Sequence, residues 1–243
     1  MVIARTVRSK TGDRFVYQRE YPRGELFASV TGYFSLANGT SQIERTYNGV
    51  LSGRDLSIRS IGDLVSKTTP TGDVYLTIRA DYQQLAAKLL GKREGSIVMM
   101  DPRTGAILAL YSWPTYDPNT IAAHNSKAAT NALEQLLADK RKPLLANAYQ
   151  ERYMPGSTFK LVTTSTAIKD GVVNPDTVFP VEKQWVPPQT NNPIENYGGK
   201  SCGGDLREVF RRSCNIPFAH IAVQLGGARF SKGADDFGLN EAP

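Results

Sequence analysis

Ser157 and Lys160 are the two side chains of this sequence best suited to covalent catalysis. A serine hydroxyl is a poor nucleophile near neutral pH and needs a base within hydrogen-bond reach. Residues three apart lie on the same face of a helix, so a helix that begins near Ser157 places the Lys160 amine beside the hydroxyl. Pro155 and Gly156 interrupt the chain directly before the serine and predict such a helix start. The pair therefore indicates acyl transfer through an acyl-serine intermediate, with Lys160 as the base.

The segment after Ser157 predicts surroundings that favour this chemistry. Residues 157–169 carry almost no charge and are apolar most of the way round. This pattern is typical of a helix buried in the centre of a domain, and Gly171 is expected to end it. At the helix N-terminus, free backbone N–H groups and the helix dipole stabilise developing negative charge. Burial one turn deeper lowers the pKa of Lys160, so the neutral amine that a base requires becomes attainable.

A second candidate motif, Ser213–Asn215, follows 56 residues after Ser157 (213 − 157 = 56). It lies in a predicted break between a short helix capped by Asp205 and another helix that Pro217 opens and that extends to about Leu225. A Ser-x-x-Lys or a Ser-x-Asn sequence alone is weak, and a lone Ser-x-Asn is usually an ordinary cap. In this order, a Ser-x-Asn between two helices directs both side chains into a cleft, which favours one shared active site.

The elements that position these motifs form two predicted units joined by a hinge at residues 67–73. Residues 1–70 are rich in Gly, Ser, Thr and Tyr, with strand-like runs at 15–18 and 26–30 between turn signals, so a β-rich module is predicted. Residues 71–243 mix strand and helix patterns. Before the serine motif we expect a strand at 74–78 and a helix at 81–90, capped by Asp81 and ended by Gly91. A hairpin at 97–110, a loop at 114–130 and a second helix at 131–140 are expected to follow.

Strands and helices together predict an α+β fold. Neither apolar run of the hairpin at 97–110 alternates with polar residues, which predicts two strands in the middle of a sheet covered on both faces. Pro, Asn and Gly are frequent between residues 172 and 204, so that stretch is expected to be irregular.

The composition limits the function classes. Hydrophobic residues make up 40% and charged residues 21% of the 243 positions, as in ordinary globular proteins and unlike disordered chains. The net charge of +6 suits an anionic cell-wall or membrane surface. A nucleic-acid partner is not expected, because no Lys/Arg run is interleaved with aromatics. No stretch approaches the ~20 apolar residues of a transmembrane helix. His124 and His220 lack metal-ligand spacing, so neither a metal nor another cofactor is expected.

Cys202 and Cys214 are the two cysteines of the chain and lie twelve residues apart (214 − 202 = 12). In a cytosolic protein they would be two buried thiols, whereas outside the cell they would form a disulfide. Composition alone does not choose between these compartments.

These motifs together resemble the class B penicillin-binding proteins, which are serine acyltransferases. The resemblance is carried by the hairpin at 98–110, by the run from Tyr153 to Lys160 and by Ser213–Asn215. The stretch Glu195–Gly199 and the Ser213–Asn215 motif are most similar to the actinobacterial penicillin-binding protein A type. The resemblance implies a β-rich N-terminal pedestal at 1–70. It also implies, at 71–243, a transpeptidase domain with a central antiparallel sheet and a helical subdomain.

The resemblance also implies a function. Class B members are peptidoglycan D,D-transpeptidases that cross-link stem peptides ending in D-Ala-D-Ala and that are acylated by β-lactam antibiotics. It assigns the nucleophile to Ser157, the base to Lys160, a proton relay at the leaving group to Ser213 and substrate-peptide binding to Asn215. It places the protein at the outer face of the cytoplasmic membrane, behind a single N-terminal anchor, with division or elongation proteins as partners. In that compartment a Cys202–Cys214 disulfide is expected.

The sequence departs from the family pattern at both ends. The family carries a third motif, Lys-Thr/Ser-Gly, on a strand after Ser-x-Asn, and no such motif follows Asn215 here. Lys10–Gly12 has the right letters but precedes the whole domain, so a surface turn is predicted there. The N-terminal anchor is also lacking. The expectation is a chain truncated at both ends and catalytically impaired by itself.

Three other functions are compatible with the motifs. A D,D-carboxypeptidase would share them and would use water as the acceptor. A class D-type β-lactamase also uses Ser-x-x-Lys, but it needs no pedestal, and residues 1–70 therefore argue against it. A non-enzymatic scaffold or sensor would be acylated without turnover.

Overall fold

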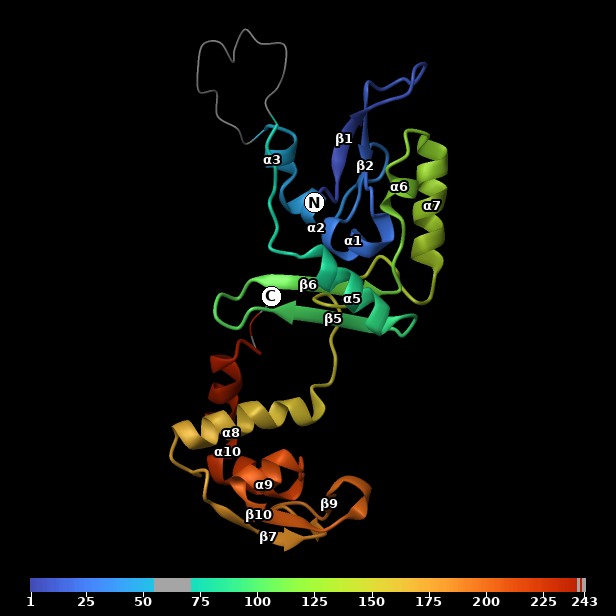
Figure 1. The fold of residues 1–243 in the computed structure, drawn as a ribbon. Helices are drawn as coiled ribbons and strands as arrows, with labels where there is room; N and C mark the ends of the chain where they lie inside the picture. The colour runs from blue at the N-terminus through green and yellow to red at the C-terminus, as the bar shows by residue number, and fades with distance from the viewer. Residues whose placement is uncertain (55–70, 240, 242–243) are drawn as a thin grey trace. The chain divides into compact units, whose positions relative to one another are not determined.

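The structure is a computed structural model that describes residues 1–54, 71–239 and 241 (Figure 1). It divides into two compact units, residues 1–152 and 153–243. The α+β class predicted from the sequence is confirmed, because both units contain strands and helices. Most of the predicted hinge at 67–73 lies outside the described residues.

The first unit begins with short strands and short helices. Its elements up to residue 54 are β1 (Arg5–Arg8), β2 (Tyr17–Glu20), α1 (Gly24–Thr31), β3 (Phe34–Ser35), β4 (Gly39–Thr40), α2 (Gln42–Thr46) and α3 (Asn48–Leu51). β1 pairs with β2, and β3 pairs with β4, both antiparallel. The strand predicted at 26–30 is wrong, because these residues belong to helix α1. Phe27, Ala28 and Val30 are all buried, and a short apolar run of this kind does not distinguish a buried strand from a buried helix.

A helix and a hairpin follow in the same unit. Helix α5 (Ala80–Leu90) packs on the antiparallel pair β5 (Gly95–Met100) and β6 (Ile107–Trp113), as Figure 1 shows. The predicted hairpin is confirmed, but its predicted coverage on both faces is wrong. Val98 and Met100 are exposed, because α5 packs on one side of a sheet that has two strands among the described residues.

The approach to α5 also differs from the prediction. The segment 74–78 forms no regular strand, although Arg79 N–H donates to the Leu108 carbonyl at 2.8 Å and ties the segment to β6. Arg79 is the N-cap residue of α5. Asp81 lies in the first turn and pairs with Arg79 at 2.8 Å, so it does not cap the helix. Gly91, with φ +60°, ends the helix as predicted.

Two helices occupy much of the stretch predicted as a loop. α6 (Pro118–Ile121) follows Asp117, whose carboxylate accepts from Asn119 N–H. α7 (Ser126–Ala138) begins earlier than predicted because Asn125 caps it, its Oδ1 accepting from Ala128 N–H at 3.1 Å. Asparagine is a preferred N-cap residue, and this local bond sets the start of the helix.

The second unit contains both serine motifs. Its elements are a 3₁₀ turn (Gly156–Thr158), α8 (Phe159–Lys169), β7 (Val178–Glu182), β8 (Gln184–Trp185), β9 (Ile194–Glu195), a 3₁₀ turn (Tyr197–Gly199), β10 (Cys202–Asp205), α9 (Leu206–Arg211) and α10 (Ile216–Asp236). β7 pairs with β10 and β8 with β9, all antiparallel. The predicted irregular stretch 172–204 therefore contains short strands. Phe179, Val209 and Ile221 belong to the core of this unit, which lies between the helices and the β7–β10 pair (Figure 1).

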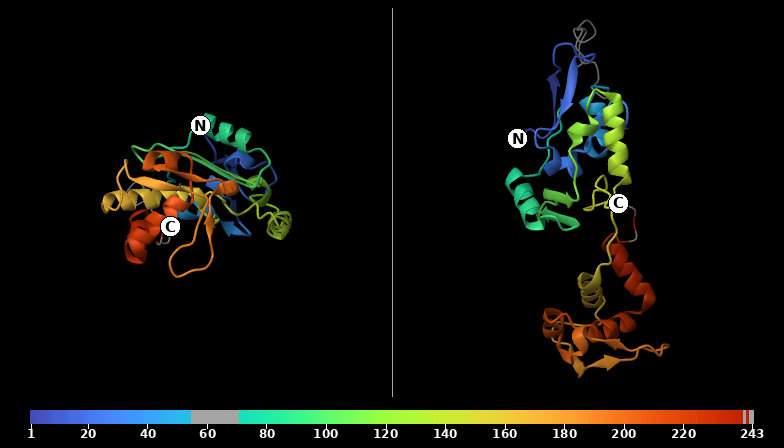
Figure 2. Two further views of the ribbon diagram at one scale, coloured as in Figure 1. Left: turned by 90° about the horizontal axis from the view of Figure 1, so that it is seen from below. Right: turned by 90° about the vertical axis from the view of Figure 1, so that its right-hand side faces the viewer.

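Helix α8 lies beside α10 in both orientations of the ribbon (Figure 1; Figure 2). The two helices approach so closely that a Cβ on Gly233 of α10 would meet Thr166 Oγ1 of α8 at 2.0 Å. The prediction that α8 is buried all round is wrong. Thr163 and Thr166 face α10 or the core, whereas Leu161 and Ile168 are exposed on the other side. Apolar composition alone does not reveal how many sides of a helix have a partner.

The ends of these helices follow local sequence signals. α8 ends as predicted at Gly171, which has φ +69°. Gly171 N–H donates to the Ile168 carbonyl and Val172 N–H to the Ala167 carbonyl, the pattern of a Schellman motif. α10 does not stop at Leu225. The backbone kinks at Gly226, with φ +73°, and helix resumes to Asp236. Across the described ranges, no helix is both long and apolar enough to span a membrane.

Candidate active site

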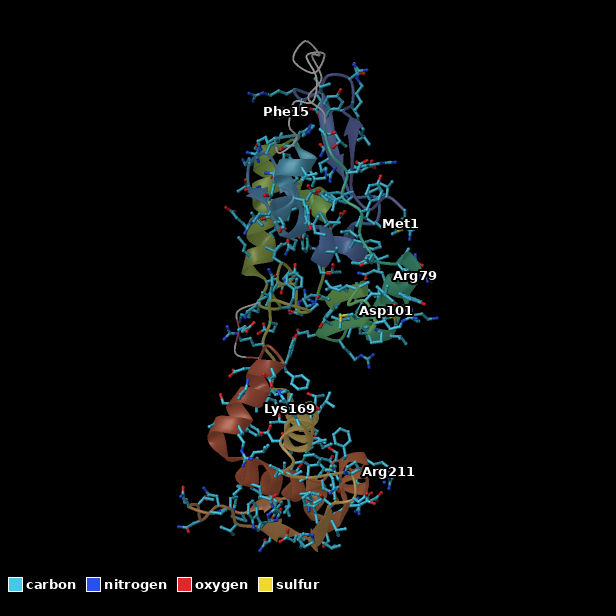
Figure 3. All side chains as sticks on the ribbon, turned by 90° about the vertical axis from the view of Figure 1, so that its left-hand side faces the viewer. Met1, Phe15, Arg79, Asp101, Lys169 and Arg211 are labelled. Carbon is cyan, nitrogen blue, oxygen red and sulfur yellow. A yellow bond between two sulfur atoms is a disulfide. The ribbon has the colours of Figure 1, made fainter. Side chains whose placement is uncertain are left out.

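Ser157 and Lys160 lie at the N-terminal end of α8, in the second unit. Gly156, with φ +54°, turns the chain into the short 3₁₀ helix that holds Ser157. Ser157 is exposed, and Lys160 is half-buried one turn later. Figure 3 labels Lys169 at the opposite end of the same helix, where it pairs with Asp236 at 2.6 Å. The predicted i, i+3 neighbourhood is present: Lys160 Nζ lies 3.2 Å from Ser157 Oγ.

Lys160 also contacts the second predicted motif. Its Nζ donates to the Ser213 carbonyl at 2.7 Å and to Asn215 Oδ1 at 2.8 Å. It lies 3.1 Å from Ser213 Oγ as well. The structure thus brings together all four residues that the sequence singled out for chemistry, Ser157, Lys160, Ser213 and Asn215. Two of the oxygens around Nζ are hydroxyls that can give up a proton, and two are acceptors only.

Ser213 occupies a strained turn that aims two of its oxygens at the lysine. Its φ is +56°, in the left-handed region that non-glycine residues rarely adopt. The turn closes α9: Ser213 N–H donates to the Phe210 carbonyl and Cys214 N–H to the Val209 carbonyl, each at 3.0 Å. This is again a Schellman pattern, with serine at the position where glycine is usual. In this conformation both the carbonyl and the hydroxyl of Ser213 lie within hydrogen-bond reach of Lys160 Nζ.

A disulfide joins Cys202 and Cys214. Cys202 begins β10, and Cys214 is the residue between Ser213 and Asn215. Both sulfur-bearing side chains are buried in the core of the unit. The bridge therefore ties the turn that carries the second motif directly to the β7–β10 pair.

Burial around Lys160 shifts its protonation equilibrium toward the neutral form. Partial burial lowers the pKa of the Lys160 amine below its usual value, because desolvation penalises the charged state. Lys160 Nζ also lies over the Phe218 ring, 5.4 Å from its centroid, a cation–π contact that by itself favours the charged form. The direction of the shift and its cause, desolvation, are those predicted from the sequence, although the burial is partial.

One functional candidate was missed by the sequence reasoning. Asn196 lies in the stretch 195–199, which carries the resemblance, but no role was predicted for it. The structure places this buried side chain against the backbone of Asn215, to which its Oδ1 is bonded at 2.8 Å. The Glu195 carbonyl accepts from Asn215 Nδ2 at 2.9 Å. No local spacing signals a contact between residues about twenty positions apart in irregular chain.

Other candidate groups have structural partners. Within the described part of the chain, no group of three or more His, Cys, Asp or Glu side chains is arranged to hold a metal. His220 Nε2 lies 2.8 Å from Glu182 Oε2, and its ring contacts that of Trp185 at a tilt of 40°. His124 pairs with Asp13. Lys10–Gly12 forms an exposed turn in the first unit, as predicted.

Comparisons with known proteins agree with this geometry. Residues 95–243 match the penicillin binding protein transpeptidase domain, and residues 1–74 match the penicillin binding protein A dimerisation domain. The peptidoglycan D,D-transpeptidase PbpA of Mycolicibacterium smegmatis is 37% identical over 96% of this chain and 50% of its own length. MrdA of Escherichia coli K12, also a peptidoglycan D,D-transpeptidase, is 30% identical over 91% of this chain and 40% of its own. The chain spans about half the length of the PbpA relatives.

Solved structures are similar over the whole chain. Penicillin-binding protein A from M. tuberculosis, solved as a penicillin G acyl-enzyme complex, has a TM-score of 0.91 at 34% identity and covers 100% of this chain and 58% of its own. The D,D-transpeptidase domain from Eggerthella lenta has a TM-score of 0.81 at 35% identity, over 99% of this chain and 51% of its own. The family match extends over more than half of the sequence, and the chain therefore belongs to the penicillin-binding protein transpeptidase family, as a class B member similar to PbpA.

Proposed function

We propose that this protein is a peptidoglycan D,D-transpeptidase that acts through an acyl-Ser157 intermediate and that β-lactams acylate at the same serine. The observation that carries the proposal is the Lys160 amine, held 3.2 Å from Ser157 Oγ by acceptors from a second motif. Family membership and the D,D-transpeptidase activity of the PbpA relatives support the reaction class.

The hydrogen bonds favour Lys160 as the base. A neutral amine has two N–H groups and one lone pair. The Ser213 carbonyl and Asn215 Oδ1 accept hydrogen bonds but cannot donate them, so they take the two N–H groups at 2.7 and 2.8 Å. The lone pair is then left for a hydroxyl proton, and Ser157 Oγ lies within reach. Partial burial lowers the pKa of Lys160, which raises the fraction of the neutral amine at a given pH.

The reaction follows from these roles. Lys160 Nζ takes the proton of Ser157 as Oγ bonds to the carbonyl carbon of the stem peptide. The C–N bond to the terminal D-Ala breaks, and the leaving amine receives a proton through the Ser213 hydroxyl. An amine of a neighbouring stem peptide then attacks the acyl carbon and forms the C–N bond of the cross-link. The C–O bond to Ser157 breaks, and the proton lost by the amine passes to Ser157 Oγ, which restores the hydroxyl. We assign binding of the substrate's peptide to Asn215, and the site of action to the outer face of the cytoplasmic membrane.

Labelling with a fluorescent penicillin tests the proposal. Stable labelling that is lost in Ser157→Ala and reduced about 100-fold or more in Lys160→Ala is the expected result. Lys169→Ala is the matched control, because this lysine lies on the same helix but pairs with Asp236 at the far end. Labelling that persists in Ser157→Ala would contradict the assignment.

The same assay separates the alternatives. Rapid release of hydrolysed penicillin would indicate a β-lactamase, and labelling without turnover of peptide substrates would indicate a sensor. With a D-Ala-D-Ala peptide, release of D-Ala into water alone would indicate a carboxypeptidase. Transfer of the peptide to an added amine acceptor supports the transpeptidase.

A further proposal concerns residues 1–243 as an isolated polypeptide. Residues 216–243 contain no Lys-Thr-Gly or Lys-Ser-Gly sequence, and the family uses such a strand for part of the oxyanion and carboxylate binding. We expect this polypeptide alone to be acylated more slowly than full-length M. smegmatis PbpA. Equal acylation rate constants for the two proteins would refute this expectation.

A further inference from the structure

The N-terminus of α10 is capped by a side chain from a distant part of the unit. The first N–H groups of a helix need acceptors, and asparagine at the N-cap position commonly supplies one. Asn215 occupies that position, yet its side chain makes no capping bond. Asn196 Oδ1 instead accepts from the backbone N–H groups of Asn215, at 2.8 Å, and of Ile216, at 3.2 Å.

The Asn196 side chain is held in one orientation. It is 5% exposed, and its Nδ2 donates to the Glu182 carbonyl at the end of β7, at 2.9 Å. Two N–H donors facing one end of the amide and a carbonyl facing the other end distinguish Oδ1 from Nδ2. The capping side chain is therefore anchored to the backbone of strand β7.

This arrangement changes what Asn215 can do. Pro217, the second residue of α10, has no N–H, and Asn196 already satisfies the N–H groups of Asn215 and Ile216. The Asn215 side chain itself makes no capping bond. Its Oδ1 accepts from Lys160 Nζ at 2.8 Å, and its Nδ2 donates to the Glu195 carbonyl at 2.9 Å.

We propose that Asn196 is a positioning residue: it caps α10 in place of Asn215, so that the Asn215 side chain is free to hold Lys160 beside Ser157. Asn196 acts through Asn215 and does not touch the reacting atoms. Its effect on the acylation rate rests on the proposed function, whereas its effect on the helix cap rests on geometry alone.

Three variants of the chain test the inference. Asn196→Ala removes both ends of the amide. Asn196→Asp keeps an acceptor oxygen, which is favourable at a helix N-terminus, but loses the bond to the Glu182 carbonyl. Asn191→Ala is the matched control, because Asn191 is exposed between β8 and β9. The acylation rate constant with fluorescent penicillin is expected to fall about 100-fold in Asn196→Ala, to stay within about tenfold of the parent in Asn196→Asp, and to be unchanged in Asn191→Ala.

Two further measurements distinguish positioning from a general loss of structure. Amide exchange at Asn215 and Ile216 is expected to be about fivefold faster or more in Asn196→Ala, with amides in the middle of α8 unchanged. In an Asn215→Ala background, adding Asn196→Ala is expected to cause no further loss of rate, because the two residues act in one chain of contacts. Additive losses of rate in this double-mutant cycle would overturn the inference.

The remaining outcomes are also decisive. A parent-like acylation rate in Asn196→Ala, with Asn215 and Ile216 deprotected, overturns the link between cap and catalysis. If Asn196→Ala does not fold, Asn196→Asp decides: a rate as low as that of Ser157→Ala overturns the inference, and a near-parent rate supports it. If the parent is not labelled at all, the proposed function fails, and amide exchange alone decides whether Asn196 is the cap.

Discussion

Removing the Cys202–Cys214 bridge tests quantitatively how the Ser213 turn is held. The cysteines are 12 residues apart in sequence, and closing a loop of this size in the unfolded chain corresponds to about 3 kcal/mol of stabilisation. Alanine is the appropriate replacement, because both side chains are buried and a serine hydroxyl would lack a partner there. The double variant Cys202→Ala/Cys214→Ala is therefore expected to unfold with a free energy lower by about 3 kcal/mol.

Urea denaturation measures this free energy for the parent, the reduced parent and the double variant. The comparison of oxidised with reduced parent isolates the bridge, since no side chain is replaced. The midpoint is expected to fall on reduction, and reductant should leave the double variant unchanged. The slope of the transition should rise when the bridge is absent, because the unfolded chain then exposes more surface.

Two results would refute this reasoning. Detection of two free thiols in the folded, non-reduced protein by mass spectrometry would show that the bridge is absent. A loss below about 1 kcal/mol on reduction would show that loop closure is not the source of stability. If the bridge also fixes the turn of Ser213 and Asn215, acylation by penicillin should slow in the reduced protein.

Two further predictions concern Lys160 and the α8–α10 contact. Partial burial lowers the Lys160 pKa, and the base must be neutral. The acylation rate constant should therefore rise with pH to a plateau, and the midpoint of the rise should lie below the usual lysine pKa of about 10.4. A pH-independent rate would contradict this. Gly233→Ala would place a Cβ 2.0 Å from Thr166 Oγ1, so thermal or urea unfolding should show a loss of about 1–3 kcal/mol. Its control, Gly227→Ala, has open space around the new Cβ and should gain about 0.5–1 kcal/mol; equal effects of the two substitutions would refute the close-packing argument.

The sequence was most informative where one short stretch determines the geometry. The i, i+3 spacing of Ser157 and Lys160 places their side chains together on any helix, and the structure has them 3.2 Å apart. The Asp205 cap and the Gly171 stop were also correct, because each depends on hydrogen bonds within a few residues. The predicted hairpin also formed, with a local turn in which Gly105 N–H donates to the Asp101 carbonyl at 2.9 Å.

Sequence patterns failed where packing partners decide the outcome. The apolar run at 26–30 belongs to helix α1. A short apolar run fits either a helix or a strand, so the sequence pattern could not choose between them. The apolar helix α8 is packed on one side and exposes Leu161, since composition does not say how many neighbours a helix has. The strands within 172–204 pair through long-range backbone bonds that no local signal announces.

The active site shows the same division. The sequence alone predicted which side chains would carry the chemistry, and it determined that Ser157 and Lys160 are neighbours, because helical spacing is a local property. Only the tertiary structure decided that Ser213 and Asn215 meet Lys160, and that Asn196 caps the helix that carries Asn215. Those contacts join segments 19 to 55 residues apart. The packing of α8 against α10 brings Lys160 to the second motif, and the bond from Asn196 to the Glu182 carbonyl at the end of β7 helps to place Asn196.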